Sequence, residues 1–406
     1  MRPILSPILS IIKSKKIYQF SLEIIYSNLI RILSRLFNKE VNNNLIIMGA
    51  YGGNAFSDNS KYVYLYLREH TNFDVYWISK NIDLYRSMVK QGYKVLSKFS
   101  LNAIKYLRKA RFIFITHGIH DILPIEFAPD TKIISMWHGA LNKRNITEHG
   151  PLYFSKLARF FKLHIVNDFF IDFYVTASGT LKDKKLIVKY FQISPNKIIA
   201  TGFPRNDILF TKDPSYLESL KIKFNIPQNT KKLFLYAPTF RDDSFVARFP
   251  LSKEELNDLN EYLKKDSSLL IMKAHMFEQS IEFEEYSNIK LSKKEADIQE
   301  LLTITDVLIT DYSSVYCDFL LLNRPILLFT YDYDEFMSQG RGFYYDFREI
   351  APGPMLYTAE DLIKAIKNID KIGKEYEEKR IETRKIYQKH VDGKSTERLL
   401  KFLGII

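Results

Sequence analysis

The 406-residue sequence predicts an α/β protein with two domains, each built on a parallel β-sheet. Its apolar residues, 46% of the chain, gather in short runs that alternate with helical stretches, which is the pattern of repeated βαβ units. The runs are continuously apolar rather than alternating, as expected of strands buried on both faces of a parallel sheet. A chain of this length also exceeds what one hydrophobic core usually supports.

The first series of strands begins after the Asn42–Asn44 run and defines a domain over residues 41–225. Helices predicted over residues 61–69 and 101–109 separate some of its strands. The expected strands cover residues 45–48, 75–78, 112–116, 133–137, 173–176 and 198–201.

A second series of strands defines a domain over residues 226–406. The break falls near residues 224–232, where Pro227 and a polar stretch interrupt the pattern. Helices are predicted over residues 254–264 and 359–366. The expected strands cover residues 233–236, 269–273, 306–310 and 325–330. Because ligands of such sheets bind at the carboxyl ends of the strands, polar residues that follow a strand are the candidates for function.

Residues 1–40 form a separate basic segment that carries seven Lys or Arg and two Glu, a net charge of +5 out of +12 for the chain. Its aliphatic residues recur at spacings of three and four, which is typical of an amphipathic helix. Two interpretations remain: a helix packed on the protein body, or a basic helix lying on an anionic membrane surface. Nucleic acid is disfavoured as a partner because aliphatic rather than aromatic residues lie between the charges.

The composition excludes several classes of protein. Cys317 is the only cysteine, so neither a disulfide framework nor a Cys-rich zinc site can form. No apolar run reaches the roughly 18 residues that span a bilayer. The positive charge indicates an acidic partner, such as an anionic membrane or a phosphate-rich substrate. No Walker pattern or G-x-G-x-x-G loop is present, and no spacing of histidines and carboxylates predicts a metal site.

Two histidines at strand ends are candidate catalytic residues. His138 follows the strand at 133–137, with Lys143 close behind, and His275 follows the strand at 269–273 together with Lys273. Histidine is the usual general base near neutral pH, and nearby cations suit a phosphate substrate. A capping or core histidine is the alternative for each, and His117 is the nearest competitor because it also follows a strand.

Further candidates follow strands of the second domain. Asp311, Ser313 and Ser314 could bind a phosphate or simply cap a helix, and Arg241 is placed to clamp an anion. An aromatic loop at residues 343–347 could form the wall of a base pocket. Candidate nucleotide or acceptor contacts are Lys143, Arg205, Asn206, Asp207, Arg341 and Gly353.

In this order, these clusters resemble the CDP-glycerol:glycerophosphate glycerophosphotransferase family, whose members build wall teichoic acids and related capsule polymers. The resemblance covers roughly residues 45–400. The matching segments are residues 56–59 (FSDN), 137–139 (WHG) with Lys143, 201–207 (TGFPRND), 236–242 (YAPTFRD), 297–301 (DIQEL), 309–314 (ITDYSS), 324–325 (RP), 329–332 (FTYD), 341–343 (RGF) with 346–347 (DF), and 351–354 (APGP).

The resemblance implies a GT-B architecture of two Rossmann-like domains, with the donor held mainly by the carboxy-terminal one. By position it implies that His138 and His275 are the functional histidines. It places Arg241, Asp311, Ser313 and Ser314 at the donor phosphates. It also implies a peripheral enzyme on the cytoplasmic side of the cell membrane, in agreement with the basic amino-terminal segment.

The implied reaction transfers a polyol phosphate, with glycerol phosphate expected, from a CDP-alcohol to a hydroxyl of a lipid-linked anionic acceptor and releases CMP. No cofactor is required, although Mg²⁺ is compatible with the chemistry. An alternative is a GT-B glycosyltransferase that uses a sugar nucleotide in cell-surface polysaccharide synthesis. A membrane-bound scaffold with an inactive transferase fold is a third interpretation.

Overall fold

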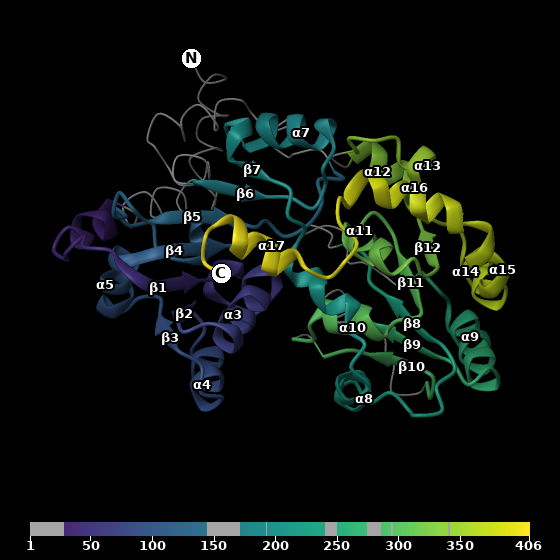
Figure 1. The fold of residues 1–406 in the computed structure, drawn as a ribbon. Helices are drawn as coiled ribbons and strands as arrows, with labels where there is room; N and C mark the ends of the chain where they lie inside the picture. The colour runs from purple at the N-terminus through teal and green to yellow at the C-terminus, as the bar shows by residue number, and fades with distance from the viewer. Residues whose placement is uncertain are drawn as a thin grey trace, which may run out of the picture. The chain divides into compact units, whose positions relative to one another are not determined.

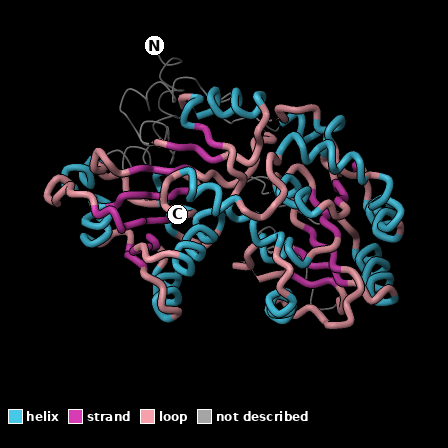
Figure 2. The backbone as a smooth tube through the Cα atoms, viewed as in Figure 1, coloured by secondary structure: helices cyan, strands magenta, loops and turns pink. Residues whose placement is uncertain are grey.

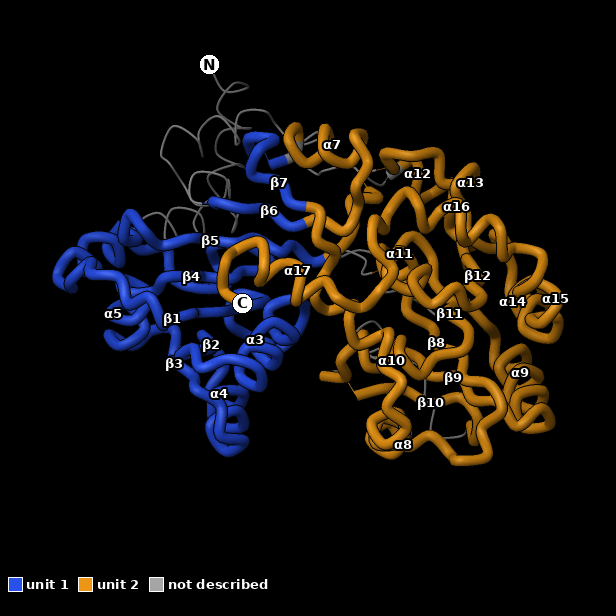
Figure 3. Tube along the Cα trace, in the orientation of Figure 1, with its two compact units in different colours: residues 1–138, 151–175, 191–199 blue, residues 139–150, 176–190, 200–406 orange. Residues whose placement is uncertain are grey.

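The computed structural model describes residues 28–143, 171–191, 193–239, 250–273, 286–293, 295–339 and 342–406. The chain forms two compact units (Figure 3). The first comprises Met1–His138, Pro151–Val175 and Phe191–Ile199, and the second comprises Gly139–Gly150, Thr176–Tyr190 and Ala200–Ile406. Helices and strands alternate in both (Figure 2), which confirms the predicted α/β class.

The first unit contains a seven-stranded sheet with the order β3-β2-β1-β4-β5-β6-β7 (Figure 1). Every pair of neighbouring strands is parallel. Its elements are β1 (Asn42–Met48), α3 (Asp58–His70), β2 (Asp74–Ser79), α4 (Ile82–Lys90), β3 (Val95–Ser97), α5 (Leu101–Lys109), β4 (Ala110–Ile115), β5 (Lys132–Ser135), β6 (Phe173–Val175) and β7 (Ile198–Ile199), with short 3₁₀ turns η1 (Tyr51–Gly53), η2 (Ile119–Asp121) and η5 (Pro195–Lys197).

The second unit contains a six-stranded sheet with the order β10-β9-β8-β11-β12-β13, again entirely parallel. Its strands are β8 (Leu233–Tyr236), β9 (Leu269–Met272), β10 (Ile289–Leu291), β11 (Val307–Thr310), β12 (Ile326–Phe329) and β13 (Met355–Leu356). Its helices include α8 (Pro214–Lys223), α9 (Lys253–Lys265), α10 (Ile298–Ile304), α11 (Val315–Phe319), α12 (Tyr333–Gln339), α13 (Phe347–Ile350), α14 (Ala359–Lys367), α15 (Ile369–Glu375), α16 (Glu377–Tyr387) and α17 (Ser395–Phe402). Its 3₁₀ segments include η6 (Pro204–Phe210) and η9 (Leu320–Leu322). Helix α7 (Leu181–Phe191) belongs to this unit except for its last residue, Phe191, which is assigned to the first.

All ten predicted strands are present, with ends that differ by three residues at most. Residues of β8, β9, β11 and β12 are buried along their whole length, because helices cover both faces of a parallel sheet. The sequence did not indicate β3, β10 and β13. These strands lie at or near sheet edges and have two or three residues each, so their apolar runs are too short to stand out.

The order of strands gives each sheet a point where the direction of winding reverses. This switch point lies between β1 and β4 in the first unit and between β8 and β11 in the second. Loops that follow those strands diverge at the carboxyl edge of the sheet and leave room for a ligand. The residues after β1, β4, β8 and β11 are therefore the first places to look for a site.

The boundary between the units differs from the one predicted at residue 225, because Ala200–Asn225 belongs to the second unit. The Asp207 carboxylate accepts hydrogen bonds from Ser395 N and Thr396 N, both at 2.7 Å, in the first turn of α17. Arg205 and Asn206 bind Asp318, whose side chain is buried. Buried polar contacts of this kind bind the segment to the carboxy-terminal sheet, and the composition near Pro227 marks only a turn.

Among the residues that the structure describes, no helix is both long and apolar enough to cross a bilayer.

A buried carboxyl group in the second unit makes stability depend on pH. Asp183 in α7 is 7% exposed, and its Oδ2 accepts a hydrogen bond of 2.8 Å from Thr176 Oγ1. Burial raises the pKa of Asp183 from 3.8 to about 6, and the Thr176 hydrogen bond only partly opposes the shift. Between these two pH values the folded protein keeps a proton that the unfolded chain releases, so its free energy of unfolding falls as the pH rises.

We predict that Asp183→Asn raises the free energy of unfolding at pH 7.5 by about 2–3 kcal/mol, because the amide removes a buried charge and its oxygen still accepts from Thr176. Urea denaturation of both proteins from pH 7.5 down to 4 measures the difference. It should shrink as the pH falls below 6. A difference that stays constant over this range would show that the ionisation of Asp183 is not its cause.

Candidate active site

His138 lies at the carboxyl edge of the first sheet beside a second histidine. β4 is followed by Thr116 and His117, and β5 is followed by Met136, Trp137 and His138. The two imidazole rings are parallel, with an interplanar angle of 1° and centroids 4.4 Å apart. The Trp137 ring lies 4.1 Å from the His138 ring. The structure thus pairs the predicted catalytic histidine with the competitor that the sequence suggested.

The loop after β1 contacts the ring of His117. The Tyr51 backbone N–H donates to His117 Nδ1 at 3.3 Å, and the two rings lie 3.9 Å apart. The loop after β1 therefore helps to hold the His117 ring in place beside the ring of His138.

A buried carboxylate holds these loops in place. Asp121 is fully buried and accepts hydrogen bonds from the backbone N–H groups of Gly52 at 2.8 Å, Thr116 at 2.7 Å and His117 at 2.6 Å. Burial raises the pKa of Asp121, while these three donors and nearby Lys98 oppose the shift. The loops after β1 and β4 are therefore tied together directly below His117.

The second unit presents a polar cluster at its own switch point. Asp311, which follows β11, is 1% exposed, and its Oδ1 accepts from Thr239 N at 2.7 Å and from Thr239 Oγ1 at 2.6 Å. Thr239 lies in the loop after β8. The Lys143 ammonium donates to Thr239 Oγ1 at 3.1 Å. A cation, a hydroxyl and a carboxylate are thus connected where a doubly wound sheet binds its ligand.

Thr239 is a residue that the sequence reasoning missed. It lies two positions before Arg241 in the segment after β8, but a threonine in that place carries no signal of its own. A hydroxyl can donate to one group while it accepts from another, and this is what joins Asp311 to Lys143. The only signal available was its position directly after a predicted strand.

The segment from Gly139 to Lys143 docks onto the loop that contains Asp311. Asn142 Nδ2 donates to the Tyr312 carbonyl at 3.2 Å, and the Asn142 carbonyl accepts from Tyr344 N at 3.1 Å. A Cβ atom at Gly139 would lie 2.8 Å from Ser314 Oγ, so only glycine fits without a shift. This close approach explains why glycine follows His138 and places Lys143 beside the candidate phosphate-binding residues.

The two serines and Lys273 lie near this cluster. Ser313 N donates to Asp311 Oδ1 at 3.2 Å, and Ser313 and Ser314 are both half-buried just before α11. Lys273 directly follows β9, and its backbone N–H donates to the Tyr236 carbonyl at 2.9 Å. Burial lowers the pKa of Lys273, although Asp297 and Glu295 partly offset the effect.

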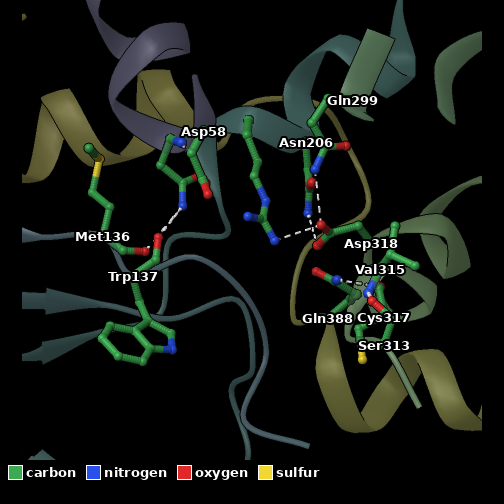
Figure 4. A network of polar contacts seen from close by, with 12 residues as sticks. Asp58, Met136, Trp137, Asn206, Gln299, Ser313, Val315, Cys317, Asp318 and Gln388 are labelled. Carbon is green, nitrogen blue, oxygen red and sulfur yellow. Dashed lines mark hydrogen bonds and ion pairs between the residues drawn. The ribbon is translucent and has the colours of Figure 1, made fainter. Parts of the chain in front are cut away.

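Several other predicted site residues receive internal partners. Arg205 Nη2 and Asn206 Nδ2 donate to the two Asp318 oxygens at 2.7 and 2.9 Å, and Gln299 adds a third hydrogen bond at 3.0 Å (Figure 4). Asp207 caps α17 as described above. These contacts give the three side chains internal partners that the sequence did not suggest, and their role as nucleotide or acceptor contacts stays a prediction.

Two further predictions change when the structure is considered. A Cβ atom at Gly353 would lie 1.9 Å from the Ile326 carbonyl oxygen, so close packing against β12 explains this glycine. Phe343 and Phe347 are 6% and 2% exposed and stack on each other within the core. Tyr344 and Tyr345 of the same loop are half-buried, so the proposed wall of a base pocket stays a prediction for those two residues.

Arg241, His275 and Arg341 lie outside the described residues, and their roles stay predictions. Among the residues that are described, no three His, Cys, Asp or Glu side chains gather as metal ligands. The prediction that no cofactor is required stays a prediction as well.

Two parallel sheets with polar residues at both switch points give the chain a GT-B-like fold, in which ligands bind at the carboxyl ends of the strands. The family model of CDP-Glycerol:Poly(glycerophosphate) glycerophosphotransferase matches residues 31–404. The chain belongs to this family and is therefore a glycerophosphotransferase of teichoic acid synthesis. The alternatives of a sugar-nucleotide glycosyltransferase and of an inactive scaffold are set aside in favour of this assignment.

Relatives of similar length support the assignment. A teichoic acid glycerol-phosphate transferase of Staphylococcus aureus is 31% identical over 90% of this chain and 94% of its own length. A teichoic acid poly(glycerol phosphate) polymerase of Bacillus spizizenii is 33% identical over 86% of this chain and 89% of its own. The solved structure of the wall teichoic acid polymerase TagF superimposes with a TM-score of 0.77 at 25% identity and covers 96% of this chain and 98% of that one.

We predict that Thr239→Val lowers the rate of CMP release from CDP-glycerol by roughly 10- to 100-fold. The substitution keeps the shape of the side chain but removes the hydroxyl that links Asp311 to Lys143, and hydrogen bonds to charged groups contribute about 1.5–3 kcal/mol. Thr239→Ser, which keeps the hydroxyl, is the control and should remain within a few-fold of the wild type. Equal rates for the valine and serine variants would remove Thr239 from the site.

Proposed function

We propose that the protein transfers glycerol phosphate from CDP-glycerol to a hydroxyl group of a lipid-linked anionic acceptor, with His138 as the general base. The observation that carries the proposal is the His138 imidazole, which stacks on the ring of His117 and lies against the ring of Trp137 at the carboxyl edge of the first sheet. Histidine is the usual general base near neutral pH.

In the proposed reaction, His138 removes the proton of the acceptor hydroxyl as its oxygen attacks the β-phosphorus of CDP-glycerol. A new phosphorus–oxygen ester bond forms and the bond to the bridging diphosphate oxygen breaks. CMP leaves with that oxygen, and the proton remains on the imidazole until solvent removes it. Reactions of this type depend mostly on positioning and on charge stabilisation.

The donor diphosphate is assigned to the second unit. The loop from Asp311 to Ser314 supplies hydroxyl and backbone donors, and Lys143 and Lys273 supply positive charge. Arg241 and His275 are proposed to neutralise the charge that develops as CMP leaves. Only four residues, Gly139–Asn142, separate His138 from Lys143 along the chain.

We predict that His138→Gln lowers CMP release by about 10²- to 10⁴-fold, the usual contribution of a general base. The assay follows CMP from CDP-glycerol, and separately from CDP-ribitol and a UDP-sugar, with a lipid-linked glycerophosphate acceptor. Release should require the acceptor and should be fastest with CDP-glycerol. His70→Gln is the matched control, because His70 is an exposed histidine at the end of α3 in the same unit.

Full activity of His138→Gln would overturn the role of His138 but not the reaction. Turnover with the UDP-sugar and none with either CDP-alcohol would overturn the donor assignment.

The acceptor and the location of the enzyme are assigned from the amino-terminal segment. Of residues 1–40, those before Asn28 lie outside the described part, and residues 28–34 are helical. Ile30 and Phe37 pack against the core of the first unit. Three aliphatic side chains on the other side of this segment are exposed to solvent: Leu29 (53%), Ile32 (61%) and Leu36 (79%).

An exposed aliphatic stripe beside basic residues suits an anionic lipid surface. Arg35 and Lys39 lie next to the stripe, and both pair with Glu126 while keeping exposed side chains. We therefore assign the enzyme to the cytoplasmic face of the cell membrane, where a lipid-linked acceptor and a soluble nucleotide donor can both reach it.

We predict that the full-length protein sediments with vesicles containing phosphatidylglycerol and binds phosphatidylcholine vesicles more weakly. The combined variant Leu29→Ser, Ile32→Ser, Leu36→Ser should lower the partition coefficient by about tenfold or more, because burial of each large aliphatic side chain contributes roughly 1.5–3 kcal/mol when complete. Ile222→Ser, at a 68% exposed site on α8, is the control and should bind as the wild type does. Unchanged binding by the combined variant would exclude the stripe as the contact.

A further inference from the structure

The amino-terminal turn of α3 is attached to the ends of three strands of the first sheet. Ser60 Oγ donates to the Gly49 carbonyl after β1 at 2.8 Å and lies 2.7 Å from Thr116 Oγ1 after β4. Asn59 Nδ2 donates to the carbonyls of Met136 at 3.2 Å and Trp137 at 2.7 Å, after β5 (Figure 4). Asn59 and Ser60 are both fully buried.

Trp137 has a backbone conformation that needs such support. Its φ is +52°, in the left-handed region that bulky residues rarely adopt. A residue in that region costs about 1–3 kcal/mol and persists only where its surroundings hold it. Tyr51 and Asp58 also have positive φ values, +50° and +60°, and both lie in segments that contact this edge of the sheet.

The remaining positive φ angles of non-glycine residues have an ordinary explanation. Among the described residues they occur at Asn225, Ser267 and Asn323, each directly after a helical segment of the second unit. A left-handed residue commonly ends a helix. The strained positions that do not end a helix therefore all belong to the first unit and gather around the loops next to His117 and His138.

We propose that Asn59 is a positioning residue for His138. This inference rests on the proposed role of His138 as the general base. The Asn59 amide holds the Trp137 carbonyl, and thereby the peptide plane between Trp137 and His138, in the strained conformation. Through the same turn of α3, Ser60 holds the strand end that leads to His117. The spacing of the two parallel imidazole rings follows from these two neighbouring anchors.

Asparagine is suited to this position by its chemistry. Its amide nitrogen carries two N–H groups, which satisfy two carbonyls at once. An aspartate in its place would set a carboxylate against two carbonyl oxygens, and a serine could satisfy only one of them. The Asp58 side chain accepts from the Asn59 backbone N–H at 2.8 Å, which fixes the amide at the start of the helix.

The test compares the steady-state kinetics of Asn59→Ala with those of Asn81→Ala. Asn81 is the matched control because its side chain also makes two hydrogen bonds at a helix start in the same unit, to the backbone N–H groups of Asp83 and Leu84. For Asn59→Ala we expect kcat for CMP release to fall about 10- to 100-fold, with KM for CDP-glycerol within a few-fold. For Asn81→Ala we expect loss of stability with kcat unchanged.

Asn59→Ser, which keeps a small polar side chain with one O–H donor, provides an intermediate variant if the alanine form does not fold. We expect its kcat to lie between those of Asn59→Ala and the wild type. A kcat for Asn59→Ser equal to that of the wild type, or a fall in kcat for Asn81→Ala as large as for Asn59→Ala, would overturn the inference.

A double-mutant cycle separates this inference from the proposed function. If Asn59 acts through His138, adding Asn59→Ala to His138→Gln should cause no further loss of kcat. A full additional loss would assign Asn59 a purely structural role. If His138→Gln is fully active, the role of His138 as the general base fails and the positioning role of Asn59 fails with it. If His138→Gln is inactive while Asn59→Ala keeps its kcat, only the positioning role fails.

Discussion

In each unit a buried aspartate ties together the two loops that diverge at the switch point of the sheet. Asp121 accepts N–H groups from the loops after β1 and β4, and Asp311 accepts them from the loops after β8 and β11. A buried carboxylate is costly unless several donors satisfy it, so the loops cannot separate without exposing an unsatisfied charge. Most of the described candidate site is built on these two carboxylates.

Because the two aspartates bind these loops, the side chains of His117 and Thr239 are held in fixed positions. The backbone N–H of His117 donates to Asp121, and the His117 ring stacks on the ring of His138. The backbone N–H and the hydroxyl of Thr239 both donate to Asp311. The same hydroxyl oxygen accepts a hydrogen bond from the Lys143 ammonium. Catalysis of phosphoryl transfer depends on groups that are already in position, because little reorganisation energy is then needed in the transition state.

In the second unit another buried aspartate, Asp318, binds the segment around Arg205 to the rest of that unit. Asp318 accepts hydrogen bonds from Arg205 and Asn206 in η6 and from Gln299 in α10. Removal of either partner of a buried ion pair leaves an uncompensated charge, so this network holds η6 firmly to α10 and α11. Arg205 and Asn206, which the sequence suggests as ligand contacts, also join segments of the chain here, because arginine and asparagine suit both purposes.

The sequence by itself determined the fold class, the position of every long strand and the strand ends that carry His138 and Asp311, because continuous apolar runs and the polar residues after them are local properties. Its resemblance to a family indicated the reaction. Only the tertiary structure decided that Asn59, Thr239 and Asp121 hold the site, since their roles are hydrogen bonds to residues distant in the chain. It also placed Phe343 and Phe347 in the core and Ala200–Asn225 with the second unit. Packing partners decide such assignments, and a local pattern contains no information about which partner a side chain will meet.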